Sequence, residues 1–414
     1  MLSIDGAQHR DLRTGRAPWA SGRRPTRRTL KQDRRCDVLV VGAGITGALA
    51  AERLVREGRD VCIVDRERPG LGSTAASTAM LLWEIDRPLA GLTDLYGFER
   101  AARLYRLSLQ AVRGLQSLVE QREIACRMRA RHSLYLAAGT TDAHALMKEH
   151  ELRGRAGLPG HFLDYRTLHH QFGIDREAAL LSSGAADADP LCLAHGLLAR
   201  AVEGGGHLFD ADAVHYDVSG RRTAVLMDDG HSIEADWVVL ATGYVMPDFV
   251  ASEIHRVTTT WAVATPPQPR RGRWRGGALI WEATEHYLDL RTTDDHRIVV
   301  GGGDDETINE PDARANATPG KSQFLLAGLR RLFPDIEPCA ETAWSGVFGT
   351  TADGLPLIGP VPGHPRILAA YGYGGNGITF GFLAAELIAG VIGGRRAAWY
   401  DDFPVGRPMP PALK

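Results

Sequence analysis

The sequence has few cysteines and no residue spacing typical of a metal site. Its five cysteines form no Cys-x-x-Cys pair, and their odd number argues against a disulfide framework. The histidines also lack ligand spacing. These absences predict a cytoplasmic protein in a reducing compartment. The longest apolar run, residues 378–394, has Glu386 near its middle, so we interpret it as a buried core helix and predict no transmembrane segment.

The sequence also lacks a strong overall charge. Its net charge of −2 over 414 residues argues against a nucleic-acid-binding protein. Residues 1–35 are the exception, because nine Arg and one Lys against three Asp give them a net charge of +7. They contain no apolar segment of the kind found in a secretory signal. We interpret them as a basic arm, either solvated or lying across an acidic body, with a nucleic-acid or membrane contact as the alternative.

Glycine, in contrast, is abundant and is placed in a recognisable pattern. The run CDVLVVGAGITG, residues 36–47, places Gly42, Gly44 and Gly47 directly after an apolar strand and at the start of a helical pattern. A second apolar strand ends at Asp65. In a βαβ unit such glycines allow a tight turn, close approach of a pyrophosphate and close helix–strand packing, while the acid accepts hydrogen bonds from a ribose. This arrangement predicts a dinucleotide site.

The glycine turn does not distinguish FAD from NAD, but four later segments bear on the choice. They are the loop GSTAAST at 72–78, the strand and turn WVVLATG at 237–243, TADGLPLIG at 351–359, and YGYGGNGIT at 371–379. The last opens the final helix, whose N-terminal N–H groups would favour negative charge at the pyrimidine end of a flavin.

Taken in this order, these segments resemble those of the D-amino-acid oxidase-like FAD oxidoreductases, which include glycine oxidase and sarcosine oxidase. The resemblance implies an α/β fold with a discontinuous Rossmann-like FAD-binding domain and a mixed-sheet α+β substrate domain. It implies oxidation of the C–N bond of a small-molecule amine or amino acid, possible substrates being a D-amino acid or a secondary amine. The product is an imine, formed by hydride transfer to flavin N5, with O₂ or a redox partner as electron acceptor. The expected divisions are an arm at 1–35, the FAD-binding domain at 36–95, 187–250 and 340–414, and the substrate domain at 96–186 and 251–339.

The cofactor-binding residues that we expect belong to the glycine turn, the acidic strand end and the small-residue loops. They are Gly42, Ala43, Gly44, Ile45, Thr46, Gly47, Asp65, Arg66, Gly72, Ser73, Thr74, Ser77, Thr78, Val214, Ala241, Thr242, Gly243, Asp353, Gly374, Gly375, Asn376, Gly377, Ile378 and Thr379.

The substrate pocket departs from the family pattern. Glycine oxidase-like relatives have a carboxylate-binding arginine five positions before the Asp of the DG segment, and here that position is Phe348. Arg291 could substitute, since Tyr287 and Arg291 share one strand face; the alternative is a surface arginine paired with Asp289 or Asp294. Trp83 and Glu84 are further candidates: Trp83 would be a pocket wall or core, and Glu84 would attract an amine, begin a helix or form a salt bridge.

Two other family features are missing. Sarcosine oxidase-like members have a lysine just before the glycines of a strand like IVVGGG, residues 298–303, and here there is none. They also attach FAD through a cysteine at about the position of Gly346. We therefore expect non-covalent FAD and leave oxidase and dehydrogenase activity as alternatives.

Two other functional classes fit the same motifs. One is a flavin monooxygenase or reductase that uses NAD(P)H, although the sequence has no second GxGxxG for the nicotinamide cofactor. The other is an FAD-binding subunit of a larger dehydrogenase complex, an alternative that only the basic arm favours.

Overall fold

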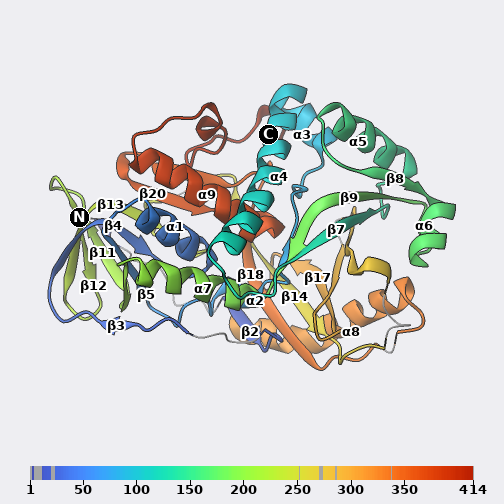
Figure 1. Cartoon of the computed structure of the whole chain (residues 1–414), viewed down its shortest axis with the longest axis horizontal. Helices are drawn as coiled ribbons and strands as arrows, with labels where there is room; N and C mark the ends of the chain where they lie inside the picture. Colours follow the sequence, from blue (N-terminus) through green and yellow to red (C-terminus); the bar gives the residue numbers. More distant parts are fainter. Residues whose placement is uncertain are drawn as a thin grey trace.

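The computed structural model describes residues 2–3, 12–19, 24–250, 252–269, 274–284, 287–336 and 338–413. The chain forms two mixed β-sheets, seen on the two sides of Figure 1, with helices packed against both. The helices are α1 (Ile45–Arg56), α2 (Ser73–Ala76), α3 (Leu89–Tyr96), α4 (Phe98–Gln121), α5 (Ala143–Arg155), α6 (Tyr165–Phe172), α7 (Pro190–Glu203), α8 (Pro311–Leu332) and α9 (Gly377–Ile392), with short 3₁₀ turns at η2 (Arg275–Gly277), η3 (Gly374–Asn376), η4 (Ala398–Asp402) and η5 (Pro411–Leu413).

The first sheet contains the predicted βαβ start. Its strands in spatial order are β1 (Leu2–Ser3), β11 (Ala213–Asp217), β12 (Thr223–Met227), β13 (Ser232–Leu240), β4 (Arg34–Val41), β5 (Val61–Asp65), β10 (His207–Asp210) and β3 (Arg28–Thr29), with β20 (His364–Tyr371) beside β13 and β19 (Leu357–Val361) beside β20. Strand β4 pairs in parallel with both β5 and β13. It is apolar because helices or other chain segments cover both of its faces.

The second sheet is formed mainly by the middle of the chain. Its strands in spatial order are β2 (Arg13–Gly15), β18 (Thr342–Thr351), β14 (His255–Ala264), β17 (Ile298–Asp305), β16 (Leu288–Thr292), β15 (Leu279–Glu282), β7 (Arg129–Leu136), β9 (Ala178–Asp187) and β6 (Met80–Leu81), with β8 (His161–Asp164) beside β9. Apolar residues on one face, such as Leu288 and Leu290, pack with Leu325 and Leu329 of α8. The period of two along each strand therefore directs the alternate residues to the opposite face.

The parallel strands bring their carboxyl ends to one edge of the first sheet. Gly42 N donates to Val64 O, and Ala241 N donates to Val41 O, each at 2.8 Å. Gly42 has a φ of +105°, and a Cβ there would lie 2.3 Å from Ala241 O. A side chain at Gly47 would lie 1.8 Å from Gly42 O. Glycine is thus required both for the turn and for the close approach of α1 to it.

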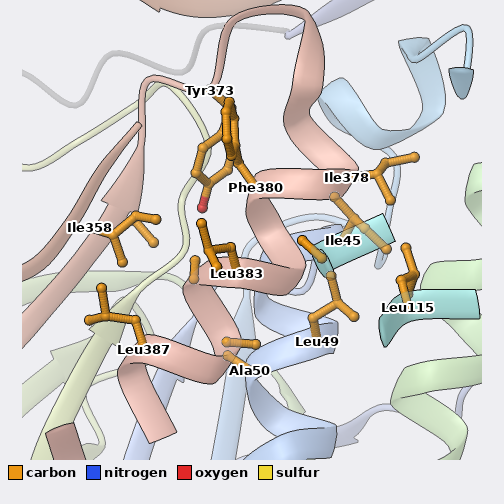
Figure 2. Packing of buried hydrophobic residues seen from close by; sticks show 14 of the residues in the cluster. Ile45, Leu49, Ala50, Leu115, Ile358, Tyr373, Ile378, Phe380, Leu383 and Leu387 are labelled. Atoms are coloured by element: carbon orange, nitrogen blue, oxygen red, sulfur yellow. The ribbon is translucent and has the colours of Figure 1, made fainter. Parts of the chain in front are cut away.

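Helix α9 packs in the core against α1 (Figure 2). Ile378, Phe380 and Leu383 of α9 belong to one buried cluster with Ile45 and Leu49 of α1. Among the described residues, one helix, Gly374–Ile392, is long and apolar enough to cross a bilayer, and 72% of that segment is buried inside the protein. Glu386 pairs with Arg53 of α1 at 2.8 Å, which accounts for the charge within the apolar run.

The basic arm contacts both sheets wherever it is described. Strand β2 pairs with β18 of the second sheet, and β3 pairs with β10 of the first. Trp19 Nε1 donates to Ser77 O at 3.0 Å, and its ring contacts Trp344 edge to face. Residues 12–19 therefore lie across the body of the protein, as one of our interpretations of the arm expected, and are not a solvated extension. Residues 1, 4–11 and 20–23 of the arm lie outside the described part.

Glycine and proline shape three of the helices. Residues 89–121 form two helices, α3 and α4, because Gly97 between them has a φ of +77°. Helix α8 begins with a proline, Pro311, at its first position. It continues through Pro319, and the Thr318 hydroxyl donates to Arg314 O at 2.8 Å.

The contact between Gly47 and Gly42 gives a first prediction. Gly47→Ala should destabilise the protein by at least about 1–3 kcal/mol, because the added methyl group overlaps a backbone carbonyl that cannot move away. Gly154→Ala in α5 is the matched control: no atom lies within 4 Å of the added Cβ, so stability should stay equal or rise. Chemical denaturation of both variants measures the difference, and equal midpoints would contradict the packing argument.

Candidate active site

One cavity of about 1030 Å³ extends between the two sheets. At one end it is lined by the glycine turn, the end of β5 and the Ala241–Gly243 turn, and at the other by β7, β15 and β16 of the second sheet. Ligands of parallel α/β sheets bind outside the carboxyl ends of the strands, where this cavity begins. Its volume is at the upper end of the range of about 300–1,000 Å³ for ligand pockets.

Most of the residues predicted to bind the cofactor line this cavity. They are Gly42, Gly44, Ile45, Thr46, Asp65, Arg66, Gly72, Ser73, Thr74, Ser77, Thr78, Ala241, Thr242, Gly243, Gly374, Gly375, Asn376, Gly377 and Ile378. Thr74 connects two of these segments, since its Oγ1 accepts from Ile45 N at 3.0 Å. Asp65 accepts from Ala43 N at 2.6 Å and from Glu67 N at 2.8 Å, and burial raises its pKa.

Four of the predicted cofactor residues lie behind the cavity wall or face away from it. Ala43 is fully buried, and Gly47 allows the close contact between α1 and the carbonyl of Gly42. Val214 is on β11 with 37% of its surface exposed, while its neighbour Ala213 lines the cavity. Thr379 is in the first turn of α9, where its hydroxyl donates to Leu82 O at 2.8 Å.

Asp353 is the fifth prediction that needs correction. It is fully buried away from the cavity and forms two hydrogen bonds with Arg407, at 2.8 and 3.0 Å. The Tyr96 hydroxyl donates to it at 2.6 Å. Burial alone would raise its pKa, but the Arg407 charge and these hydrogen bonds outweigh burial and lower it. Asp353 therefore joins the C-terminal segment to α3.

Two of the proposed substrate residues also lie outside the cavity. The Arg291 guanidinium is buried, and its Nη1 donates to the carbonyl oxygens of Thr78, Ala79 and Ala188 at 2.8–2.9 Å. Arg291 thus holds the end of the 72–78 loop in place. Both interpretations of Arg291 from the sequence, as a substrate-binding residue and as a surface residue paired with an aspartate, were wrong. Trp83 is a core residue, with its Nε1 donating to Ser183 O at 2.9 Å.

Tyr287, Phe348 and Glu84 do line the cavity. Glu84 is 1% exposed, and its Oε1 accepts from the Ser133 hydroxyl. The Arg153 Nη1 atom lies 3.8 Å from the same oxygen. Glu84 Oε2 has no hydrogen-bond partner among the described residues. The helix-start interpretation of Glu84 was wrong, whereas its long contact to Arg153 fits the salt-bridge alternative in part.

Strand register places one row of residues across the second sheet. Trp281 is opposite both Tyr135 and Asp289, Asp289 is opposite Gly301, and all of them line the cavity. The Tyr135 and Trp281 rings stack with centroids 3.9 Å apart. A Cβ at Gly301 would lie 2.3 Å from Asp289 Oδ1, so the glycine makes room for this carboxylate.

Asp86 has a similar place at the start of α9. Its Oδ2 accepts from Gly375 N at 2.7 Å and its Oδ1 from Asn376 Nδ2 at 3.2 Å. A Cβ at Gly374 would lie 2.0 Å from Asp86 Oδ2. One of the N–H groups that we expected to face a flavin is therefore engaged by a carboxylate.

The pKa values show that these carboxyl groups interact. Burial raises the pKa of Asp86 to about 6, and the charge of Asp304 adds to the effect. Burial likewise raises the pKa of Asp289 to about 6, despite a hydrogen bond from Thr78, and Asp304 again adds to it. Burial also raises the pKa of Tyr287 well above its usual range, and Asp304 accepts a hydrogen bond from it. Asp86 itself is exposed to the cavity.

Sequence reasoning missed Asp86 and Asp304 and assigned Asp289 only as a surface partner. Alternation along the strand could have placed Asp289 on the face of Tyr287, since the two are separated by one residue. No local pattern could have pointed to Asp86, because its place in the cavity depends on a hydrogen bond with Gly375, which is 289 residues later in the chain. Leu12 of the arm also lines the cavity, and it too was missed.

The cavity fits FAD. Gly377 has no atom within 4 Å of an added Cβ, and Gly44 meets only the Thr74 hydroxyl, at 3.2 Å, so a ligand can approach the chain closely at both glycines. The acid at the end of β5 and the glycine turn provide the features that bind an adenosine diphosphate. The fold and cavity together define a dinucleotide-dependent enzyme with a second sheet over its cofactor site.

Comparison with known proteins identifies the family. A family model described as FAD-dependent oxidoreductase (DAO) matches residues 37–391. Gamma-glutamylputrescine oxidoreductase of Escherichia coli K12 is 25% identical over 384 residues, which cover 91% of this chain and 87% of that protein. Glycine oxidase of Geobacillus kaustophilus is 24% identical, covering 88% of this chain and 95% of that protein.

The solved structures agree on the fold. The crystal structure of Geobacillus kaustophilus glycine oxidase matches with a TM-score of 0.78 and 20% identity, covering 91% of this chain and all of that one. Iminodiacetate oxidase from Chelativorans sp. BNC1 matches with a TM-score of 0.71 and 22% identity, covering 89% and 98%. The chain belongs to the DAO family of FAD-dependent oxidoreductases.

The buried Asp353–Arg407 pair gives the second prediction. Asp353→Asn should lower the free energy of unfolding by about 3–5 kcal/mol, because it leaves a buried guanidinium unpaired. Because folding lowers the pKa of Asp353, its contribution is present above the ordinary value of 3.8 and is lost as pH falls below it. Denaturation between pH 3 and 7 should therefore show a smaller loss with acid in the variant.

A surface pair of the same geometry is the control for that measurement. Arg222 binds both oxygens of Asp236 at 2.9 and 3.0 Å, but both side chains are about 30% exposed. Asp236→Asn should therefore cost no more than about 1 kcal/mol. Equal losses in the two variants would show that the buried pair has no special structural role.

The contact between Trp19 and Ser77 gives the third prediction. Trp19→Ala should raise the rate of FAD dissociation at least about fivefold, because one net hydrogen bond to the loop is worth about 1 kcal/mol. Trp19→Phe retains most of the ring packing and should have a smaller effect. The fluorescence of released FAD after dilution measures both rates, and rates equal to wild type would exclude a cofactor-retaining role for the arm.

Proposed function

We propose that this protein oxidises the C–N bond of an amine or amino acid to an imine, with FAD as the bound cofactor. The observation that supports this best is a continuous cavity that joins the dinucleotide features of the first sheet to the aromatic and acidic face of the second. FAD accepts a hydride at its N5 when bound. The substrate loses this hydride from the carbon next to nitrogen and a proton from the nitrogen, and water then hydrolyses the imine.

In this reaction the chain itself has to position the substrate and limit the access of water. The second sheet covers the cavity with Trp261, Trp281 and Trp344, while β2 of the arm adds a strand beside β18. No Ser-His-Asp or Cys-His arrangement is required, because no covalent intermediate with a side chain is needed. The described residues that line the cavity include no cysteine, which supports non-covalent FAD.

The lining of the cavity also bears on the substrate. Phe348 of β18 takes the position that holds a carboxylate-binding arginine in glycine oxidase-like relatives, and it faces the cavity. Arg291 does not replace this arginine, because its guanidinium is bound to backbone carbonyls. We therefore propose that simple α-amino acids such as glycine are poor substrates. The electron acceptor is O₂ or a redox partner.

The experiment that tests this proposal follows the flavin itself. Purified yellow protein is mixed anaerobically with D-amino acids, N-methyl amino acids and polyamines, and bleaching of the visible flavin band is recorded. At least one amine should bleach it, and peroxide formed on admitting air would indicate an oxidase. Bleaching by NADPH without any amine would instead support a reductase, and no bleaching at all would support a subunit that needs a partner.

Phe348 provides the fourth prediction. Phe348→Arg should improve binding of glycine-like substrates by about ten- to a hundredfold, since charge-assisted hydrogen bonds contribute about 1.5–3 kcal/mol. Phe348→Leu removes the ring without adding charge and is the control for changes in cavity size. The substrate dependence of anaerobic flavin reduction measures both, and equal values for the two variants would reject the assignment of this position.

A further inference from the structure

The far end of the cavity from the dinucleotide features is acidic. The carboxylate residues that line it are Glu84, Asp86, Glu282, Asp289, Asp304, Asp305 and Glu306. Within the described part of the chain, the Arg residues that line the cavity are Arg66 and Arg68, next to Asp65, and no Lys or His lines it. A substrate carboxylate would therefore meet only negative charge at this end.

Some of this charge is neutralised by cations outside the cavity. Arg176 binds Glu282 at 2.8 Å, and Lys321 is 3.4 Å from Asp305. Asp86 and Asp289 differ from these two, because among the described residues neither lies within ion-pair distance of an Arg or Lys. The Arg291 charge lowers the pKa of Asp289 less than burial raises it. Their hydrogen bonds, from Gly375 N and from Thr78, are made with neutral groups. Asp86, which is exposed to the cavity, and the partly buried Asp289 thus face it without an ion-pair partner among the described residues.

The surroundings of these carboxylates suit a cationic ligand. Register places Asp289 directly beside Trp281, whose ring stacks on Tyr135, so an aromatic wall adjoins the carboxylate. An ammonium group binds favourably near both carboxylates and aromatic rings. Glu84, itself 1% exposed, also lines the cavity, and its buried Oε2 has no hydrogen-bond partner among the described residues. This unsatisfied oxygen is an observation independent of the acidic cluster.

Two glycines leave the space that these carboxylates occupy. Side chains at Gly301 and Gly374 would overlap Asp289 and Asp86, at 2.3 and 2.0 Å respectively. We propose that the cavity binds a substrate with a second cationic group, a diamine or polyamine, and that Asp86 and Asp289 recognise the ammonium that does not react. This inference rests on the proposed function, because it assumes that the reacting amine is oxidised in the same cavity.

The test compares three ligands of one length with the FAD-loaded full chain. They are 1,4-diaminobutane, its mono-N-acetyl derivative, which lacks one charge, and 4-aminobutanoate, which has a carboxylate in place of the second amine. Binding is measured from perturbation of the oxidised flavin spectrum, and turnover from anaerobic bleaching. The diamine should bind at least about tenfold more tightly than either of the others.

Three variants locate the effect. Asp289→Asn and Asp86→Asn should each reduce the ratio of the two affinities, diamine over acetylated compound, about tenfold, and both affinities are measured on the same flavin-containing sample. Asp335→Asn, at an exposed position in the loop after α8, removes the same charge away from the cavity and should change neither value. Thermal melting and the visible spectrum show whether each variant is folded and contains flavin.

The outcomes separate this inference from the proposed function. Reduction by glycine, sarcosine or D-alanine but not by the diamine would overturn the inference and leave amine oxidation in place. A failure of every amine to reduce the flavin would overturn both. Equal binding of the diamine and its acetylated derivative, or an unchanged preference in both Asp86→Asn and Asp289→Asn, would reject the ammonium site alone.

Discussion

The parallel pairing of β4 with β5 on one side and with β13 on the other is the constraint on which the site depends. It brings three strand ends to one edge, where the backbone of Gly42 is held by Val64 and close to Ala241. Because Gly47 contacts the same turn, α1 starts directly at this edge. The cavity, the loop 72–78 and the start of α9 are all arranged around it, so any change in this pairing would displace every segment that surrounds the cofactor.

The second sheet determines what the cofactor can act on. Its strands present a polar and aromatic face to the cavity and an apolar face to α8, as the period of two requires. Register then decides which residues become neighbours, and it aligns Tyr135, Trp281 and Asp289 across three strands. The result is a cavity whose charge is opposite to the one that an amino-acid carboxylate needs. The family membership alone would not have indicated this.

Several predictions from sequence failed for one reason, which is that local patterns do not show what a side chain contacts. Arg291 was placed on the correct strand, but its guanidinium binds the carbonyls of a loop more than 200 residues earlier. Asp353 belongs to a family-like segment, yet it is bound by Arg407 and Tyr96 and does not reach the cavity. Long polar side chains reach across several ångströms, so residue position does not determine their partners.

The sequence by itself determined the nucleotide-binding half of this protein and its family, because glycine spacing and apolar strands are local features with strict backbone requirements. It also indicated that α9 is a core helix, since Glu386 interrupts an otherwise apolar run. The tertiary structure decided the charge of the substrate end, the place of the basic arm and the role of Asp86. These depend on contacts between segments far apart in the chain, which no local pattern of residues encodes.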